Sequence, residues 1–207
     1  MYIELYGIPG VGKTTTCDEL VKAENYIKIK KIKNLKEINF ITAIKTIPKY
    51  LSIMNYIYNE YCRTMFINIT KKERSVFRKS LFVCLYHYYD TYDKKEVYVT
   101  DHGIIQSLAE NSFLLLYDRI IFWKNLLHLL PSKNNKSIQL DLLPYDVMFR
   151  AKKRSFEEMS TYARDMNDLS TYMLFFERIG REFNNSITVD ASKKVNIIIK
   201  NIIKELK

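Results

Sequence analysis

Three of the five glycines in this 207-residue chain fall close together near its start. The segment from Gly7 to Thr14 reads Gly-Ile-Pro-Gly-Val-Gly-Lys-Thr and matches the pattern G-x-x-x-x-G-K-[ST] at every fixed position. In such a loop successive backbone N–H groups curl around a phosphate, the lysine reaches the outer phosphates, and the threonine hydroxyl binds Mg²⁺. The pattern therefore predicts a nucleotide-binding loop. Its expected binding residues are Gly7, Gly10, Val11, Gly12, Lys13, Thr14 and Thr15.

A second candidate for chemistry is Asp101, which directly follows the β-branched run Val97–Thr100. An acid at the end of a buried strand is where a nucleotide-binding protein of this kind holds Mg²⁺ or one of its water ligands. The alternative is that Asp101 caps a following helix. His102 beside it could contact a phosphate or a substrate, or make only a local hydrogen bond.

A third candidate is the basic run Arg-Ala-Lys-Lys-Arg, in which Arg150 and Arg154 lie one helical turn apart. Phosphoryl transfer develops charge on the transferred group, and a mobile cationic lid can neutralise this charge while excluding water. We therefore predict a short basic lid at about residues 150–168, with Arg150 and Arg154 as catalytic cations. A solvated helix that pairs with Glu157 and Glu158 is the alternative.

Arg74 and Arg78 form another pair spaced by four residues, near the start of a helix expected over Lys72–Tyr89. Such a pair could line a pocket for the phosphate acceptor. The competing interpretation is a surface pair with Glu73.

The elements that must position these groups alternate between strands and helices. Strands are expected at Tyr2–Tyr6, Tyr26–Lys30, Val97–Asp101, Ser137–Leu142 and Ser186–Asp190. Helices are expected from Lys13 to Ala23, over Glu37–Met65 and Lys72–Tyr89, between Ile104 and Leu130, over Leu169–Phe183, and from about Val195 onward. This alternation implies right-handed crossovers and a mainly parallel sheet covered by helices on both faces, an α/β architecture.

Composition places the chain among ordinary globular proteins, since 47% of its residues are hydrophobic and 27% are charged. We expect one domain over residues 1–207, with no linker or repeat dividing it.

The three cysteines are far apart and lack metal-site spacing, which favours a reducing compartment. The start of the chain has no basic signal region, so a cytoplasmic location is expected. No window is long and uncharged enough to suggest a transmembrane segment. The formal net charge of +10 favours polyanionic partners without choosing among them.

With these residues in place, the chain resembles the nucleoside and nucleotide kinase branch of the P-loop fold, and thymidylate-kinase-like proteins in particular. The segment from Tyr98 to Gly103 is similar to the family's Asp-Arg strand end, with His102 where arginine is usual. The resemblance implies a three-layer α/β/α P-loop NTPase fold with a mainly parallel five-stranded sheet. It also implies ATP, or another NTP, with Mg²⁺ on the phosphate loop, and an acceptor held between the long helices and the lid.

Carried over by position, the resemblance implies that Lys13 and Thr14 bind the phosphates and the metal. It also implies that Asp101 binds the metal or the acceptor, and that Arg150 and Arg154 bind the transferred group. The family generally has an acid at the end of the second strand, whereas the segment from Ile29 to Asn34 offers only lysines and an asparagine among its polar residues.

Three functions fit these observations. The first is a small-molecule kinase that transfers the γ-phosphate of ATP to a nucleoside, a nucleotide or a related compound. The second is an NTPase or nucleotide-dependent switch that acts with a nucleic acid or a protein, although no nucleic-acid-binding motif accompanies the basic charge. The third is a remnant that binds nucleotide without turnover.

The apolar face of Ile38–Tyr61 fits a core helix, a membrane-docking surface or a homodimer interface equally well.

Overall fold

In the computed structural model of the chain, much of the N-terminal half beyond the first strand and helix lies outside the described part. The structure describes residues 1–23, 29–32, 51, 53, 55, 56, 59, 83–91, 95–115, 125, 126, 128–130, 135–152, 165–182 and 186–206. Most of the helix expected over Glu37–Met65, and the first part of the one expected over Lys72–Tyr89, lie outside these residues.

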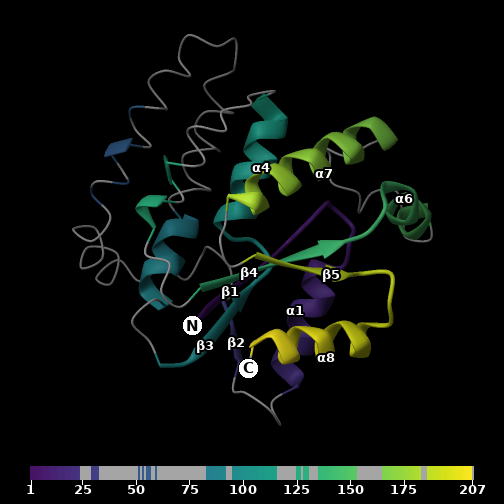
Figure 1. Ribbon diagram of the computed structural model, residues 1–207, viewed down its shortest axis with the longest axis horizontal. Helices are drawn as coiled ribbons and strands as arrows, with labels where there is room; N and C mark the ends of the chain where they lie inside the picture. Colours follow the sequence, from purple (N-terminus) through teal and green to yellow (C-terminus); the bar gives the residue numbers. More distant parts are fainter. Residues whose placement is uncertain are drawn as a thin grey trace.

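Five parallel strands form the central sheet (Figure 1). In chain order they are β1 (Tyr2–Tyr6), β2 (Ile29–Lys31), β3 (Val97–Thr100), β4 (Asn135–Asp141) and β5 (Ser186–Asp190). Their order across the sheet is β2-β3-β1-β4-β5, so the strand that leads into the phosphate loop lies at the centre. In the register, Tyr2 faces Tyr98 on one side and Asn135 on the other. The predicted parallel five-stranded sheet is confirmed.

Helices cover both faces of the sheet, which gives the predicted three layers (Figure 1). On one face lie α1 (Lys13–Lys22) and α8 (Val195–Leu206), which contact each other. On the other lie α4 (Ile104–Leu115) and α7 (Met166–Arg181), which also pack together. The helix α6 (Pro144–Lys152) follows β4 and contacts α7, and residues 83–91 are helical as well.

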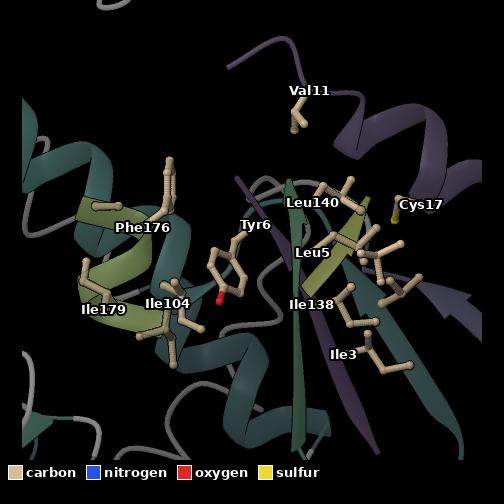
Figure 2. Close-up of a cluster of buried hydrophobic side chains, with 14 of the residues drawn as sticks. Ile3, Leu5, Tyr6, Val11, Cys17, Ile104, Ile138, Leu140, Phe176 and Ile179 are labelled. Atoms are coloured by element: carbon tan, nitrogen blue, oxygen red, sulfur yellow. The ribbon is translucent and has the colours of Figure 1, made fainter. Parts of the chain in front are cut away.

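Alternation along β1 divides the core between the two faces, because successive side chains of a strand point in opposite directions. Ile3 and Leu5 point toward Cys17 of α1, whereas Tyr6 points toward Ile104 and Phe176 (Figure 2). All five residues of β1 are buried, as expected for the central strand of a covered parallel sheet. This pattern places Glu4 on the same face as Tyr6, so a carboxylate is buried against the start of α4.

Two helix boundaries differ from the sequence prediction. The α7 helix begins at Met166 rather than Leu169, because the side chain of Asp165 caps it by accepting a hydrogen bond of 2.8 Å from the Asp168 N–H. The α6 helix begins at Pro144, two residues after the strand expected at Ser137–Leu142, where the sequence analysis predicts no helix. Proline suits the first turn of a helix because its missing N–H would have no partner there.

These boundaries bear on the predicted lid at residues 150–168. Its two described ends are helical, the first in α6 and the second in α7, and residues 153–164 lie outside the described part. Within the part of the chain that the structure describes, no helix is long and apolar enough to cross a membrane.

Candidate active site

The phosphate loop connects β1 to α1 at the carboxyl edge of the sheet. Gly7 has a φ of 149°, and a Cβ atom there would lie 2.6 Å from the carbonyl oxygen of Leu140 on β4. Gly12 has a φ of 107° with nothing within 4 Å of a Cβ position, so its backbone conformation alone favours glycine. A hydrogen bond of 3.2 Å from the Val11 N–H to the Ile8 carbonyl closes the turn between them.

The start of α1 suits an anion. Gly12 occupies the N-cap position in the left-handed region, no side chain caps the helix, and its first turn carries no acid. Thr14 and Thr15 are both exposed at this end. The positive end of the helix dipole and the first backbone N–H groups are therefore directed at the place where the motif predicts a phosphate.

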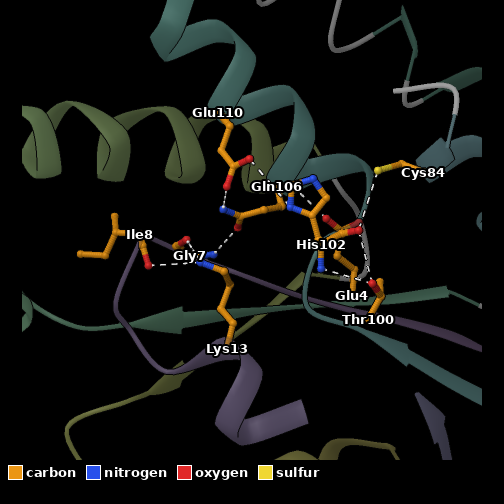
Figure 3. A network of polar contacts seen from close by, with 9 residues as sticks. All are labelled: Glu4, Gly7, Ile8, Lys13, Cys84, Thr100, His102, Gln106 and Glu110. Atoms are coloured by element: carbon orange, nitrogen blue, oxygen red, sulfur yellow. Dashed lines mark hydrogen bonds and ion pairs between the residues drawn. The ribbon is translucent and has the colours of Figure 1, made fainter. Parts of the chain in front are cut away.

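The ammonium group of Lys13 lies over the loop, where its Nζ donates to the carbonyl oxygens of Gly7 at 2.8 Å and Ile8 at 3.3 Å (Figure 3). Burial lowers the pKa of Lys13 to about 8, while the negative charges of Glu110 and Asp101 act in the opposite direction. A phosphate group would add further negative charge beside this ammonium, and we therefore expect nucleotide binding to restore its full positive charge.

Asp101 follows β3, the neighbour of β1 in the sheet, so both loops end at the same edge. Its carboxylate is partly buried, and its charge acts on Lys13 and on the thiol of Cys17. Burial is the main cause that raises the pKa of Cys17 to about 12, and Asp101 adds to it. The structure therefore places Lys13 and Asp101 at the same edge of the sheet, and their roles stay predictions.

The donor groups at this edge fit Mg²⁺. This ion commonly uses one or two protein oxygens together with substrate phosphates and water, rather than a complete cage of side chains. The hydroxyl of Thr14 and the carboxylate of Asp101 are donors of this kind. Among the described residues no group of three histidine, cysteine or acidic side chains could hold a metal ion by itself.

A polar network from α4 supports the loop, and sequence reasoning missed it. The side chain of Gln106 accepts a hydrogen bond of 3.2 Å from the Gly7 N–H and donates one of 2.6 Å to Oε1 of Glu110 (Figure 3). Gln106 is fully buried and Glu110 is partly exposed. Only the spacing of four residues on one helix hinted at their pairing, since the contact with Gly7 spans 99 positions.

Glu4 fixes the start of the same helix. Its Oε1 accepts a hydrogen bond of 2.8 Å from the backbone N–H of Gln106, and the N–H groups of Ile104 and Ile105 also favour the charged carboxylate. Burial outweighs these bonds and raises the pKa of Glu4 to about 8. A Cβ on Gly103 would lie 2.3 Å from Cδ of Glu4, so this close approach requires glycine.

His102 occupies the turn between β3 and α4. Its backbone N–H donates to the hydroxyl of Thr100 at 3.2 Å, and its imidazole is 43% exposed. Its Nδ1 lies 3.8 Å from Oε2 of Glu110, whose side chain is 30% exposed. The backbone of His102 thus makes a local hydrogen bond, and contact between its ring and a substrate stays a prediction.

Arg150 lies at the other side of the loop. Its guanidinium donates to the carbonyl oxygen of Ala191 at 2.9 Å and lies 3.5 Å from that of Val11. Arg154, Arg74 and Arg78 lie outside the described residues, so their roles stay predictions.

Comparison with solved structures identifies the fold. A deoxyadenosine kinase from M. mycoides with bound dATP matches with a TM-score of 0.57 at 18% identity, over 100% of this chain and 99% of that one. The same enzyme with the products dCMP and a flexible dCDP matches with a TM-score of 0.58, at 18% identity over 100% and 98%. The YorR protein from Bacillus subtilis, in complex with phosphorylated GDP, matches with a TM-score of 0.57, at 14% identity over 99% and 94%.

No family model and no curated protein matches the sequence. The likeness is therefore one of fold, and it extends over the whole chain. The fold is the one seen in these solved structures, a three-layer α/β/α arrangement with a five-stranded parallel sheet and helices on both faces, and this is the fold that the sequence resemblance implies.

Proposed function

We propose that this chain is an ATP- and Mg²⁺-dependent phosphotransferase that acts on a small-molecule acceptor, namely a nucleoside, a nucleotide or a related compound. The observation that supports this most is the meeting of an uncapped phosphate loop, its Lys13 and the carboxylate of Asp101 at one edge of the sheet. Solved structures with this fold that contain dATP, or dCMP with dCDP, lend further support.

In this proposal the phosphates of the nucleotide bind across the first N–H groups of α1, and the ammonium of Lys13 moves from the loop carbonyls onto them. Thr14 and Asp101 would hold Mg²⁺, which when bound neutralises charge on the phosphates. Thr15, Gly10 and Val11 complete the cradle. Arg150 holds the loop against the segment after β5, where we place the base of the nucleotide.

Other features also stay proposals. We propose one domain over residues 1–207, a lid at about 150–168 in which Arg150 and Arg154 contact the transferred group, and an acceptor pocket that includes Arg74, Arg78 and His102. A cytoplasmic location and a homodimer remain expectations from the sequence.

The experiment that tests the function is an ADP-release assay with ATP and Mg²⁺, without and with pools of nucleosides, nucleotides and sugars. Lys13→Ala and Asp101→Asn are compared with Lys22→Ala, a matched control whose lysine is 70% exposed on the far end of α1. Acceptor-stimulated release that disappears in the first two variants and persists in the third supports the proposal. Release that no acceptor stimulates contradicts it and favours an NTPase.

The alternative with a nucleic-acid partner depends on the basic charge. Residues 22–36 are rich in lysine, and the described lysines among them do not favour this alternative. Lys22, Lys30 and Lys31 each lie within 2.7 Å of a carboxylate, on Glu19, Glu96 and Asp18 respectively. These pairs agree with a solvated surface. Tight binding of DNA or RNA that weakens steeply with salt would revive the alternative.

A further inference from the structure

Transfer of a phosphoryl group to a hydroxyl needs a carboxylate or another base to orient the hydroxyl and accept its proton. The described end of the second strand, residues 29–32, carries no acid that could do this. Two carboxylates act on the ammonium of Lys13, those of Glu110 and Asp101. A third, Glu4, joins the same network through Gln106.

These three carboxylates differ in what they can reach. Glu4 is only 2% exposed, and the first N–H groups of α4 already bind it. Asp101 is the proposed metal ligand. Glu110 remains, and its side chain is 30% exposed beside the loop. Of the three carboxylates, Glu110 alone meets three conditions. It acts on Lys13, an acceptor can reach it, and it is not a proposed metal ligand.

The two oxygens of Glu110 have different surroundings (Figure 3). Oε1 accepts the hydrogen bond from Gln106, which is itself held by the Gly7 N–H of the phosphate loop. Oε2 lies 3.8 Å from Nδ1 of His102, beyond the distance of a good hydrogen bond. One oxygen is thus fixed relative to the phosphate loop, and the other can accept a hydrogen bond from an incoming hydroxyl.

We propose that Glu110 binds the acceptor hydroxyl and takes its proton, that Gln106 and His102 position this carboxylate, and that the acceptor is a neutral hydroxyl compound such as a nucleoside. This rests on the proposed kinase function. The acceptor oxygen forms a bond to the γ-phosphorus of ATP while the bond from that phosphorus to the β–γ bridging oxygen breaks. ADP keeps the electron pair, and the proton passes to Glu110 and then to solvent.

The choice of a neutral hydroxyl acceptor follows from the need for a base. A phosphate oxygen, the acceptor group of a nucleotide, is already largely ionised near neutral pH and has no proton for Glu110 to take. A hydroxyl carries such a proton and can donate it directly to Oε2 of Glu110.

The test measures acceptor-stimulated ADP release by the wild type, Glu110→Gln and Glu110→Asp, with Glu19→Gln as the control on the surface of α1. Glu110→Gln keeps an oxygen for the Gln106 hydrogen bond and removes the proton acceptor. We expect its kcat to fall about 100-fold or more with nucleoside acceptors, while its dissociation constant for ATP stays within about threefold. Glu110→Asp keeps a carboxylate on a shorter side chain, so its kcat should decrease less. This variant provides the test if Glu110→Gln does not fold.

The outcomes separate the two proposals. If the wild type transfers phosphate and Glu110→Gln keeps its kcat within about threefold, Glu110 is not the base and the kinase function stands. A wild type that prefers nucleoside monophosphates over nucleosides overturns the neutral acceptor. A wild type that no acceptor stimulates overturns both proposals together.

Gln106→Leu tests the positioning part. It removes both side-chain hydrogen bonds, so the carboxylate remains but loses its fixed orientation. We expect kcat to fall by less than in Glu110→Gln, and the acidic limb of the pH–rate profile to persist, whereas Glu110→Gln should lose that limb. A kcat equal to that of the wild type would show that Gln106 does not position Glu110.

Discussion

Arg150 of α6 and Ala191, 41 residues further along the chain, are joined by a hydrogen bond of 2.9 Å from Nη2 to the Ala191 carbonyl oxygen. Nη1 of the same guanidinium lies 3.5 Å from the carbonyl oxygen of Val11. One side chain therefore connects the phosphate loop with the segment that follows β5, and it sets the distance between two walls of the proposed nucleotide site.

Removal of this connection should weaken nucleotide binding. In Arg150→Lys the positive charge remains, but a single ammonium cannot reproduce the planar fork that reaches two carbonyl groups. We expect the dissociation constant for ATP to rise about tenfold in Arg150→Lys and at least as much in Arg150→Ala. Isothermal titration calorimetry measures this. Arg181→Ala, at an 80% exposed position of α7, is the control that should bind as the wild type does.

The buried Glu4 predicts a pH dependence of stability. Its pKa rises from 4.5 to about 8 on folding, so the folded protein holds this proton over a range in which the unfolded chain has lost it. The contribution to stability is complete below about pH 4.5 and is lost as the pH rises through about 8. Urea unfolding at pH 5.5 and pH 8 should show a fall of a few kcal/mol from this group.

Glu4→Gln isolates that effect from other titrating groups. The amide keeps an oxygen for the Gln106 N–H and carries no charge at either pH. We expect its free energy of unfolding to change less between pH 5.5 and 8 than that of the wild type. Parallel pH dependences in the two proteins would show that Glu4 does not titrate in this range.

Gly7→Ala should damage the phosphate loop more than Gly12→Ala. Both glycines have positive φ, so each substitution strains the backbone by about 1–2 kcal/mol. At Gly7 the new Cβ would also lie 2.6 Å from the Leu140 carbonyl oxygen, whereas at Gly12 nothing lies within 4 Å. Thermal unfolding should therefore show a larger fall in Tm for Gly7→Ala, and equal falls would contradict the steric part of the explanation.

Gly103→Ala tests the fit between β1 and α4. The added methyl group would overlap the carboxyl carbon of Glu4, at 2.3 Å, and we expect a loss of about 2 kcal/mol or more in stability. The double variant Glu4→Ala with Gly103→Ala should lose less than the sum of the two single changes, because the overlapping carboxyl group is gone. A strictly additive loss, measured by urea unfolding, would mean that the two residues do not compete for space.

The sequence predicts the fold well because its signals are local. The phosphate loop follows Tyr2–Tyr6 directly, and the strand ending before Asp101 is a short β-branched run, so both halves of the proposed metal site are visible without tertiary information. The alternation of strands and helices was enough for the parallel three-layer architecture.

What the sequence could not show depends on contacts between distant residues. Glu4 lies 102 positions before Gln106, and nothing near Glu4 in the sequence indicates that a helix start would bury it. Glu110 resembled any acid on a helix until Gln106 and His102 were placed beside it. The start of α6 was missed because Pro144 suits both the end of a strand region and the first turn of a helix.

The parallel arrangement of the strands separates the molecule into a part that carries the proposed chemistry and a part that only supports it. Lys13, Asp101 and Arg150 follow the carboxyl ends of three strands, while the amino ends of these strands carry none of the proposed site residues. If Glu110 has the role proposed for it, a change of acceptor needs different residues around Glu110 and leaves the sheet as it is.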